Sequence, residues 1–336
     1  MLLESLCNAS GVSGNEAEIR NIIISEIKPY CDEIFVDSIG NVIALKKGKD
    51  HSKKVMLSAH MDEVGFIISG ITDKGYLEFK KVGGIDTRVI ISKNVLVGEK
   101  KIPGVIGMKA IHLQSKGERE EVPKVKSLFI DIGAKDKEDA EKYVNLGDYA
   151  TFSTKYREIG EDRIKAKALD DRVGCYVLTK LIRESVKFDT YFCFTVQEEV
   201  GLRGARVAAY RIKPDIALVL ESTTCSDVHN VPEHRMVTEM GKGVAISFMD
   251  SATIYNKEYV EFLRKISEGI PTQFKKMTSG GNDAGAIHIT GEGIKTASLS
   301  IPARYIHSPV GVASKKDIDA MEKLAKRFLD CVDEVI

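Results

Sequence analysis

The sequence predicts an α/β protein into which a smaller β-rich domain is inserted. After about residue 163, apolar strand segments alternate with helical segments, which is the layering of α/β proteins. Between about residues 68 and 162, short β-type segments are separated by Gly and Pro instead. We therefore expect a main domain made of residues 1–67 and 163–336 and an inserted domain made of residues 68–162.

The first elements follow from local patterns. Ser13 and Glu16 have the spacing of a capping box, and isoleucines then recur at helical intervals, which predicts a helix over residues 15–29. The segments EIFVD and NVIAL flank a Ser-Ile-Gly turn and predict a hairpin. The polar run KKGKDHSKK is expected to be a solvated loop before the strand VMLSA.

The later elements are read in the same way. In the inserted segment only DKEDAEKYV has a helical pattern. Beyond it we expect the strand RIKAKA, the helix DDRVGCYVLTKLIRE, the buried strand TYFCFTVQ, a helix near residues 201–210, the strand DIALVLES and a C-terminal helix from about residue 316.

Composition limits the classes of partner. Forty-nine basic and forty-nine acidic residues give a formal net charge of zero, so neither nucleic acid nor a membrane surface is an expected partner. The first residues do not resemble a signal peptide, and no apolar run is long enough to span a bilayer. The six cysteines are widely spaced, which favours reduced thiols in a cytoplasmic protein.

Candidate functional residues stand where predicted strands end or helices begin, which is where α/β sheets hold their binding sites. Any one of them could be an ordinary turn or capping residue. Together, two histidines and several carboxylates form a ligand set suited to a divalent metal such as Zn²⁺. The set comprises His60, Asp62, Asp170, Glu198, Glu199, Glu221 and His307.

The number of carboxylates indicates two metal ions, because neighbouring dications need a bridging anion to offset their repulsion. Asp170 is the candidate bridge. Glu198 and Glu199 are adjacent, so their side chains point in different directions on an extended segment. One of them could bind metal while the other accepts a proton from water.

These motifs, taken in order, resemble the M42 family of metallo-aminopeptidases, the group that includes glutamyl and deblocking aminopeptidases. The segments HMD, LDDR, QEE and RYIHSP carry the resemblance, and GVSGNE and SGGNDAGAIH are also similar to family segments. The long interval between His60 and Asp170 fits a domain inserted there. The resemblance implies a central mixed sheet flanked by helices, as in zinc exopeptidases, with a small β-barrel-like inserted domain.

The resemblance also implies roles. His60 and Glu221 would bind one metal, Glu199 and His307 the other, and Asp170 would bridge them. Glu198 would be the general base, and Asp62 would accept a hydrogen bond from His60 and fix its ring. The family more often has Asp where this chain has Glu221.

The expected function is therefore a two-metal aminopeptidase that removes the N-terminal residue from peptides with a free N-terminus, with Zn²⁺ as the expected metal and Co²⁺ or Mn²⁺ as the other candidates. The resemblance implies that the inserted domain assists dimerisation and substrate access and that dimers form a tetrahedral dodecamer. Two alternatives stay open: a cellulase-type glycoside hydrolase using the paired glutamates, and a peptide-binding protein without catalysis.

Two further features have alternative interpretations. The loop of residues 278–283 contains two glycines and could form a wall of the substrate pocket or an ordinary entry to a helix. His112 belongs to the inserted domain and could approach a site only across the interdomain cleft or from another subunit, and His229 could line the entrance.

Overall fold

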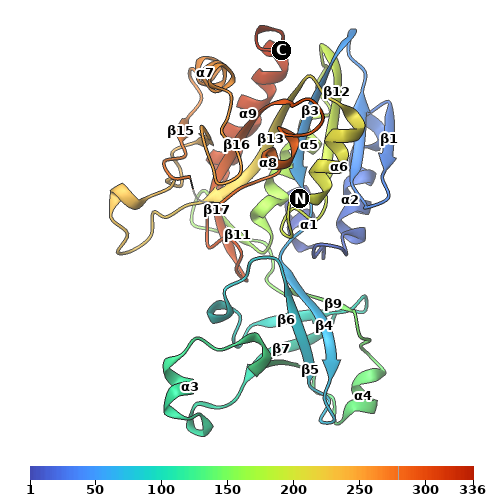
Figure 1. The fold of residues 1–336 in the computed structure, drawn as a ribbon, viewed down its shortest axis with the longest axis vertical. Helices are drawn as coiled ribbons and strands as arrows, with labels where there is room; N and C mark the ends of the chain where they lie inside the picture. The colour runs from blue at the N-terminus through green and yellow to red at the C-terminus, as the bar shows by residue number, and fades with distance from the viewer. Residues whose placement is uncertain (279) are drawn as a thin grey trace.

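A computed structural model describes residues 1–278 and 280–336. The chain forms a large mixed sheet with helices on both faces and a separate closed barrel at one end (Figure 1). This arrangement confirms the predicted α/β class with an inserted β-barrel.

The large sheet has the strand order β1-β2-β12-β3-β13-β16-β17-β11-β10, and β14 joins β15 to β16. Strand β3 is parallel to β12 and β13, and β13 is parallel to β16, so the carboxyl ends of these central strands meet at one edge. The strands are β1 (Glu33–Val36), β2 (Val42–Lys46), β3 (Asp50–His60), β10 (Arg157–Ile159), β11 (Arg163–Ala166), β12 (Phe188–Thr195), β13 (Ile216–Thr224), β14 (Val244–Ile246), β15 (Thr272–Phe274), β16 (Lys295–Arg304) and β17 (Gly311–Ser314).

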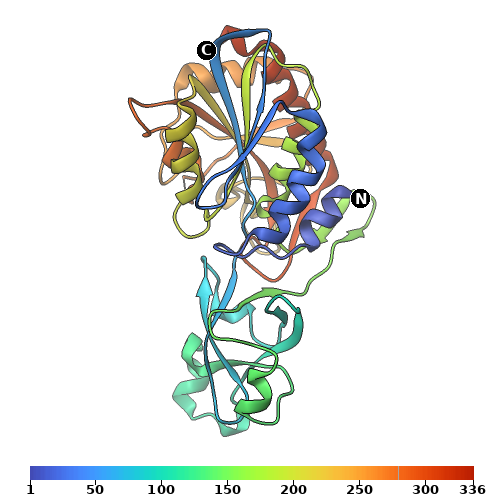
Figure 2. The same ribbon diagram turned by 90° about the vertical axis from the view of Figure 1, so that its right-hand side faces the viewer.

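Helices cover both faces of this sheet (Figure 2). One face is covered by α1 (Leu2–Asn8), α2 (Ala17–Ile27), α5 (Leu169–Leu181) and α9 (Lys315–Cys331), which contact one another through α5. The other face is covered by α6 (Arg203–Ile212) and α8 (Ala284–Ile287), while α7 (Lys257–Ile266) packs against α9 and β14. The central strands are consequently buried on both sides, which explains their nearly continuous apolar sequences.

The barrel closes in the order β4-β5-β8-β7-β6-β9 around its own apolar core, where Phe66 packs edge-on against Phe79 and Phe152. Its strands are β4 (Gly65–Ile71), β5 (Leu77–Val82), β6 (Asn94–Val97), β7 (Ile102–Met108), β8 (Leu128–Asp131) and β9 (Tyr149–Phe152), and it carries the short helices α3 (Lys116–Glu120) and α4 (Lys137–Glu141). The barrel strands thus begin three residues before the expected range of 68–162. Strand β10 lies within that range but belongs to the large sheet.

Single-turn 3₁₀ helices complete the described secondary structure, at Lys28–Tyr30, Thr87–Val89, Ile111–Leu113, Val125–Ser127, Glu233–Arg235 and Val332–Glu334. Within residues 1–278 and 280–336, no helix combines the length and the apolar character needed to cross a membrane. All six cysteines are free thiols.

Two local predictions were wrong. Ser13 and Glu16 do not form a capping box: the Ser13 hydroxyl donates to Asp62, and Glu16 accepts from the Gly14 N–H. The polar run after β2 is not wholly a loop, because β3 begins at Asp50 and pairs with β12 from there. The first residues of β3 are polar and exposed, so the sequence did not predict them as a strand. A strand end that faces solvent can pair without an apolar pattern.

Candidate active site

The edge where the central strands end gathers every residue predicted for the site. His60 is the last residue of β3, Glu198 and Glu199 follow β12, and His307 follows β16. Glu221 lies inside β13, which continues two residues further than the sequence suggested, and Asp170 lies in the first turn of α5. Strand pairing sets Thr195 of β12 opposite His60, so the glutamate pair emerges beside the histidine.

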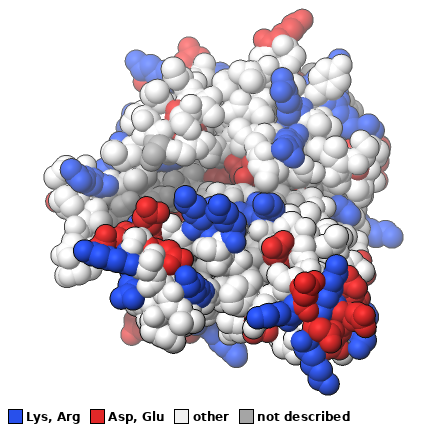
Figure 3. Space-filling view, turned by 60° about the horizontal axis from the view of Figure 1, so that its bottom comes forward, with Lys and Arg blue, Asp and Glu red and all other residues white. Residues whose placement is uncertain are grey.

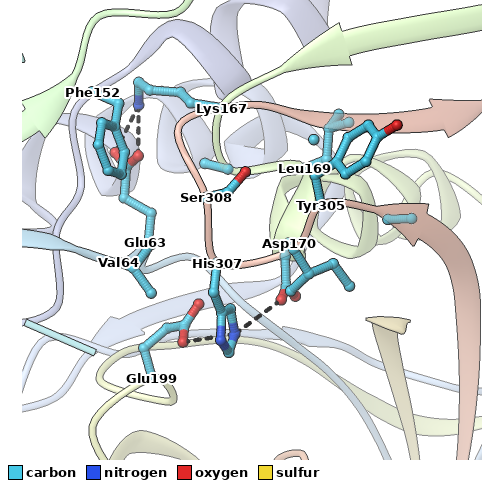
Figure 4. A pocket seen from close by; sticks show the side chains of 14 residues that line it. Glu63, Val64, Phe152, Lys167, Leu169, Asp170, Glu199, Tyr305, His307 and Ser308 are labelled. Carbon is cyan, nitrogen blue, oxygen red and sulfur yellow. Dashed lines mark hydrogen bonds and ion pairs between the residues drawn. The ribbon is translucent and has the colours of Figure 1, made fainter. Parts of the chain in front are cut away.

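Asp170 stands between the two histidines, with one carboxylate oxygen toward each. Its Oδ1 lies 3.3 Å from His60 Nε2, and its Oδ2 lies 3.5 Å from His307 Nε2. Each histidine also has a glutamate beside it. Glu221 Oε1 is 3.4 Å from His60 Nε2, and Glu199 Oε2 is 3.1 Å from His307 Nε2. The result is two histidine–glutamate pairs that share one aspartate, and Figure 4 shows the pair at His307.

Glu198 lies beside the first of these pairs, with its Oε2 4.0 Å from His60 Nε2. Its neighbour Glu199 faces His307 instead, so the two adjacent glutamates serve different parts of the site.

Asp171 is a buried carboxylate that the sequence reasoning missed. It can approach a common point with His60 and Glu221, and its Oδ2 has no hydrogen-bond partner among the described residues. Its Oδ1 accepts from the Gly174 N–H at the start of α5. The Asp170–Asp171 doublet was the only signal in the sequence, and it did not distinguish the two residues.

Burial and mutual repulsion disfavour ionisation of the glutamates. Burial holds the pKa of Glu198 well above its usual range, with Glu221 adding to the effect and His60 opposing it. Burial likewise raises the pKa of Glu199 and of Glu221 to about 8. The cluster therefore contains more carboxylates than its own histidines can keep charged.

The surrounding carboxylates favour the charged form of both histidines. Burial works against protonation of His307, but Asp170 and Glu199 raise its pKa to about 9. His60 behaves in the same way: burial would lower its pKa, but Glu221, Asp170 and Asp62 together raise it well above the usual value. This excess of carboxylates, together with imidazole nitrogens that converge on common points, fits divalent cations.

Asp62 fixes the backbone of both glutamates. Its Oδ1 accepts the Glu198 N–H at 3.0 Å, and its Oδ2 accepts the Glu199 N–H at 3.2 Å. The Ser13 hydroxyl donates to the same Oδ2 at 2.6 Å, and Oδ1 lies 3.4 Å from His60 Nδ1. That last distance is long for a hydrogen bond, so Asp62 holds the glutamate segment more firmly than it holds the imidazole.

A buried ion cluster joins the end of β3 to the start of α5. Glu63 accepts from Lys167 Nζ at 2.7 Å and from the Gly11 N–H at 3.0 Å, and Arg172 lies 3.5 Å away. All three side chains are at least nine-tenths buried. Because removing one member would leave a buried charge unpaired, the cluster fixes how the His60 and Asp170 segments meet.

A cavity opens beside His307 and Asp170. Its lining includes Val64 and Phe152 from the barrel side and Leu169 and Tyr305 from the sheet side (Figure 4). The face seen in Figure 3 is hollowed, with acidic side chains inside the hollow and basic side chains along its border. The barrel and the large sheet thus both contribute to the walls around the site.

The remaining candidates lie elsewhere. His112 is exposed in the barrel and belongs to none of the possible metal-binding groups found in the described residues. His229 is exposed in the loop after β13. In the loop of residues 278–283, Ser279 lies outside the described residues, while Asn282 Oδ1 accepts the Ala284 N–H at the start of α8.

Comparison with known proteins identifies the family. Residues 40–324 match the sequence profile of the M42 glutamyl aminopeptidases. The chain belongs to the M42 family of aminopeptidases. A putative aminopeptidase of Acetivibrio thermocellus is 45% identical, over 96% of both chains.

Solved structures of similar peptidases have the same fold. The TET aminopeptidase of a marine sediment Thaumarchaeota archaeon is 36% identical with a TM-score of 0.95, covering 98% of this chain and 95% of that one. The TET1 peptidase of Pyrococcus horikoshii is 35% identical with a TM-score of 0.86, covering 98% of each chain, and it assembles into a tetrahedron or a large octahedral shell.

Proposed function

We propose that this M42 protein is a two-metal aminopeptidase, with His60 and Glu221 holding one divalent ion, Glu199 and His307 the other, and Asp170 bridging them. The observation that supports this most directly is the pair of Asp170 oxygens, each facing a different histidine. Zn²⁺ suits this mixture of imidazole and carboxylate donors, and Co²⁺ and Mn²⁺ share it. When bound, the ions would supply Lewis-acid chemistry that activates a water and polarises the scissile carbonyl.

Glu198 is the general base in this proposal. Its carboxylate lies beside His60 without facing His307, and burial together with Glu221 strengthens its affinity for a proton. It accepts the proton of the attacking water on a carboxylate oxygen and later donates it to the leaving amine. Asp62 keeps Glu198 and Glu199 in their different orientations through their backbone N–H groups.

Replacing Glu198 by Gln tests the proposal. The amide keeps the shape but cannot accept the proton, so Glu198→Gln should lower kcat on aminoacyl-p-nitroanilides by at least about 100-fold. Metal content, measured by elemental analysis, should stay near that of the wild type. Glu233→Gln, an exposed position in the loop after β13, serves as the matched control and should leave both quantities unchanged.

The same assay separates the alternatives. N-acetylated substrates should not be cleaved, because a free amine is required to place the scissile bond. Activity on glycans that survives complete chelation would favour a glycoside hydrolase, and binding of peptides without turnover in any metal would favour a non-catalytic protein. The position of Glu198 and Glu199, each next to a histidine, argues against the first of these.

We also infer that copies of this chain assemble, as the Pyrococcus horikoshii peptidase does. Several large apolar side chains of the sheet domain are exposed, and Phe248 contacts Phe274 on that surface. Exposed apolar groups of this kind mark contacts between proteins. They include Phe248, Met249, Ile254, Phe274, Met277 and Ile289.

A further inference from the structure

Asn282 and Asp283, at the start of α8, extend across the central strands next to the proposed metal centre. Asn282 Nδ2 donates to the Ser298 hydroxyl of β16 at 3.2 Å, and Asp283 Oδ2 accepts from the Thr195 hydroxyl of β12 at 2.5 Å. Strands β13 and β3 lie between β16 and β12 in the sheet. These two residues therefore span both strands that supply ligands to the first half of the centre.

Strand register places Asp283 beside His60. Strand β12 is parallel to β3, and Thr195 is paired with His60. Paired residues of neighbouring strands project from the same face, and the strands lie about 4.8 Å apart. Because the Thr195 hydroxyl holds one oxygen of Asp283, this carboxylate lies next to the imidazole. Asp283 is 1% exposed and His60 is 2% exposed, so little solvent screens the two groups from each other.

Asp283 does not act as an ordinary helix cap. It is the N-cap residue of α8, but its side chain accepts no capping hydrogen bond, and the Ala284 N–H donates to Asn282 Oδ1 instead. Asp283 Oδ1 is buried and has no hydrogen-bond partner among residues 1–278 and 280–336. Leaving a buried carboxylate oxygen unpaired is costly, so helix capping does not explain why this side chain turns toward the sheet.

The His60 imidazole also has an incompletely bonded nitrogen. Its Nε2 faces Asp170 and Glu221, which leaves Nδ1 to carry the ring N–H. A metal-binding histidine normally donates this N–H to a carboxylate, a carbonyl or a water. His60 Nδ1 is buried, and its contact with Asp62 Oδ1, at 3.4 Å, is long for a hydrogen bond. Asp62 alone therefore does not account for how the imidazole is held.

The charges of Asp283 and His60 interact. Burial raises the pKa of Asp283 to about 6, and Asp62 adds to this effect. His60 opposes it more strongly than the Thr195 hydroxyl does, although that hydroxyl contacts Asp283 directly. Such an effect requires the two charges to be close in the protein interior. A negative Asp283 would equally stabilise an imidazole that binds a dication.

We propose that Asp283 is a positioning residue, which together with Asp62 holds the His60 imidazole and strengthens metal binding in the His60 half of the centre. The inference rests on the proposed two-metal function. Asp170 stands between the two histidines, so the influence of Asp283 should be much smaller at His307. The loop of residues 278–283, for which the sequence suggested a pocket wall or a helix entry, would thereby support the metal centre.

The test measures the affinity for Zn²⁺ by chelator competition with metal-free wild type and Asp283→Asn. Asparagine keeps the shape of the side chain but removes its charge, so one of the two ions should bind about 10- to 100-fold more weakly and the other as in wild type. Asp317→Asn is the matched control, because Asp317 is also buried and accepts the Gly241 and Gly243 N–H groups beside α9. It should lower thermal stability without changing either affinity.

Histidine variants show which ion is affected. His307→Ala leaves the proposed ligands of the His60 ion, and His60→Ala leaves those of the other ion. Adding Asp283→Asn should weaken metal binding in the His307→Ala protein and leave it unchanged in the His60→Ala protein. The visible absorption of bound Co²⁺ gives a second readout, which should change in the first background only. A general disturbance of the structure would affect both backgrounds alike and would contradict the inference.

The Thr195 hydroxyl provides a rescue experiment. Thr195→Val removes the donor that holds Asp283 and should weaken the same ion, whereas Thr195→Ser keeps the donor and should restore its affinity. Equal weakening of both ions by Asp283→Asn, or no weakening of either, would overturn the inference and leave the proposed function intact. This criterion holds even if a histidine variant binds no metal. A wild type that binds no metal and hydrolyses no peptide would overturn both proposals.

Discussion

Asp62 connects three parts of the chain at one buried carboxylate. It receives the Ser13 hydroxyl from the N-terminal segment and two backbone N–H groups from the segment after β12, and it lies two residues beyond His60. Its expected role was to orient the imidazole. Its contacts show a wider role, because a shift of this carboxylate would displace Glu198 and Glu199 as well.

Ser13→Ala should loosen this arrangement. Removing a donor from a buried carboxylate costs about 1–3 kcal/mol, and displaced supporting groups typically weaken metal affinity by about 10-fold or more. We expect weaker metal binding in a chelator competition and a lower kcat. Ser10→Ala, three residues earlier, makes no such contact and is the control. Equal metal affinities for Ser13→Ala and wild type would show that Asp62 does not depend on this hydroxyl.

Glu16 should give folding stability a distinct pH dependence. Burial raises its pKa from the usual 4.5 to about 7, with Asp62 adding to the effect and the Gly14 N–H opposing it. The folded protein therefore binds more protons than the unfolded chain between these values, so stability is full below pH 4.5 and falls as the pH rises through 7. The shift is worth up to about 3 kcal/mol.

The measurement is thermal unfolding of metal-free wild type and Glu16→Gln at pH 5 and pH 8, so that loss of metal in acid does not contribute. The variant should gain stability relative to wild type at pH 8. Parallel behaviour of the two proteins would contradict a raised pKa.

The sequence was sufficient to predict which residue types form the site, and the structure brings all seven of them together. Their pattern at strand ends predicts convergence, because parallel strands end at a common edge. This pattern could not reveal Asp171. Asp170 and Asp171 are the same residue type at adjacent positions, and only the directions of their side chains distinguish them.

At the level of elements, the buried strands were the most predictable. The nearly continuous apolar runs in β3, β12 and β13 are typical of strands that are buried on both faces of a sheet. The capping-box prediction failed because a tertiary partner, Asp62, competes for the Ser13 hydroxyl. Local sequence patterns also could not predict that the barrel closes, because β4 pairs with β9, more than 80 residues away along the chain.

At the level of the whole molecule, assembly is directly measurable. Twelve copies of a 37.1 kDa chain would have a mass of about 445 kDa, which light scattering coupled to size exclusion can test. Ile254→Asp should reduce the mass, because Ile254 is 77% exposed within the apolar surface inferred to bind another copy. Tyr30→Asp changes an exposed aromatic residue of the 3₁₀ helix Lys28–Tyr30, which is not part of that surface, and should not. A monomer or dimer of the wild type would contradict the proposed assembly.

The order of strands in the sheet also bears on how the protein is made. Strand β3, which carries His60, lies between β12 and β13, and both are synthesised much later. At about 5–20 residues per second, roughly 12–50 s separate translation of His60 from that of His307. A ribosome-bound chain therefore cannot assemble both halves of the centre until most of the sheet exists. The proposed hydrolytic activity is thereby delayed until His307 has been synthesised and the central strands have paired.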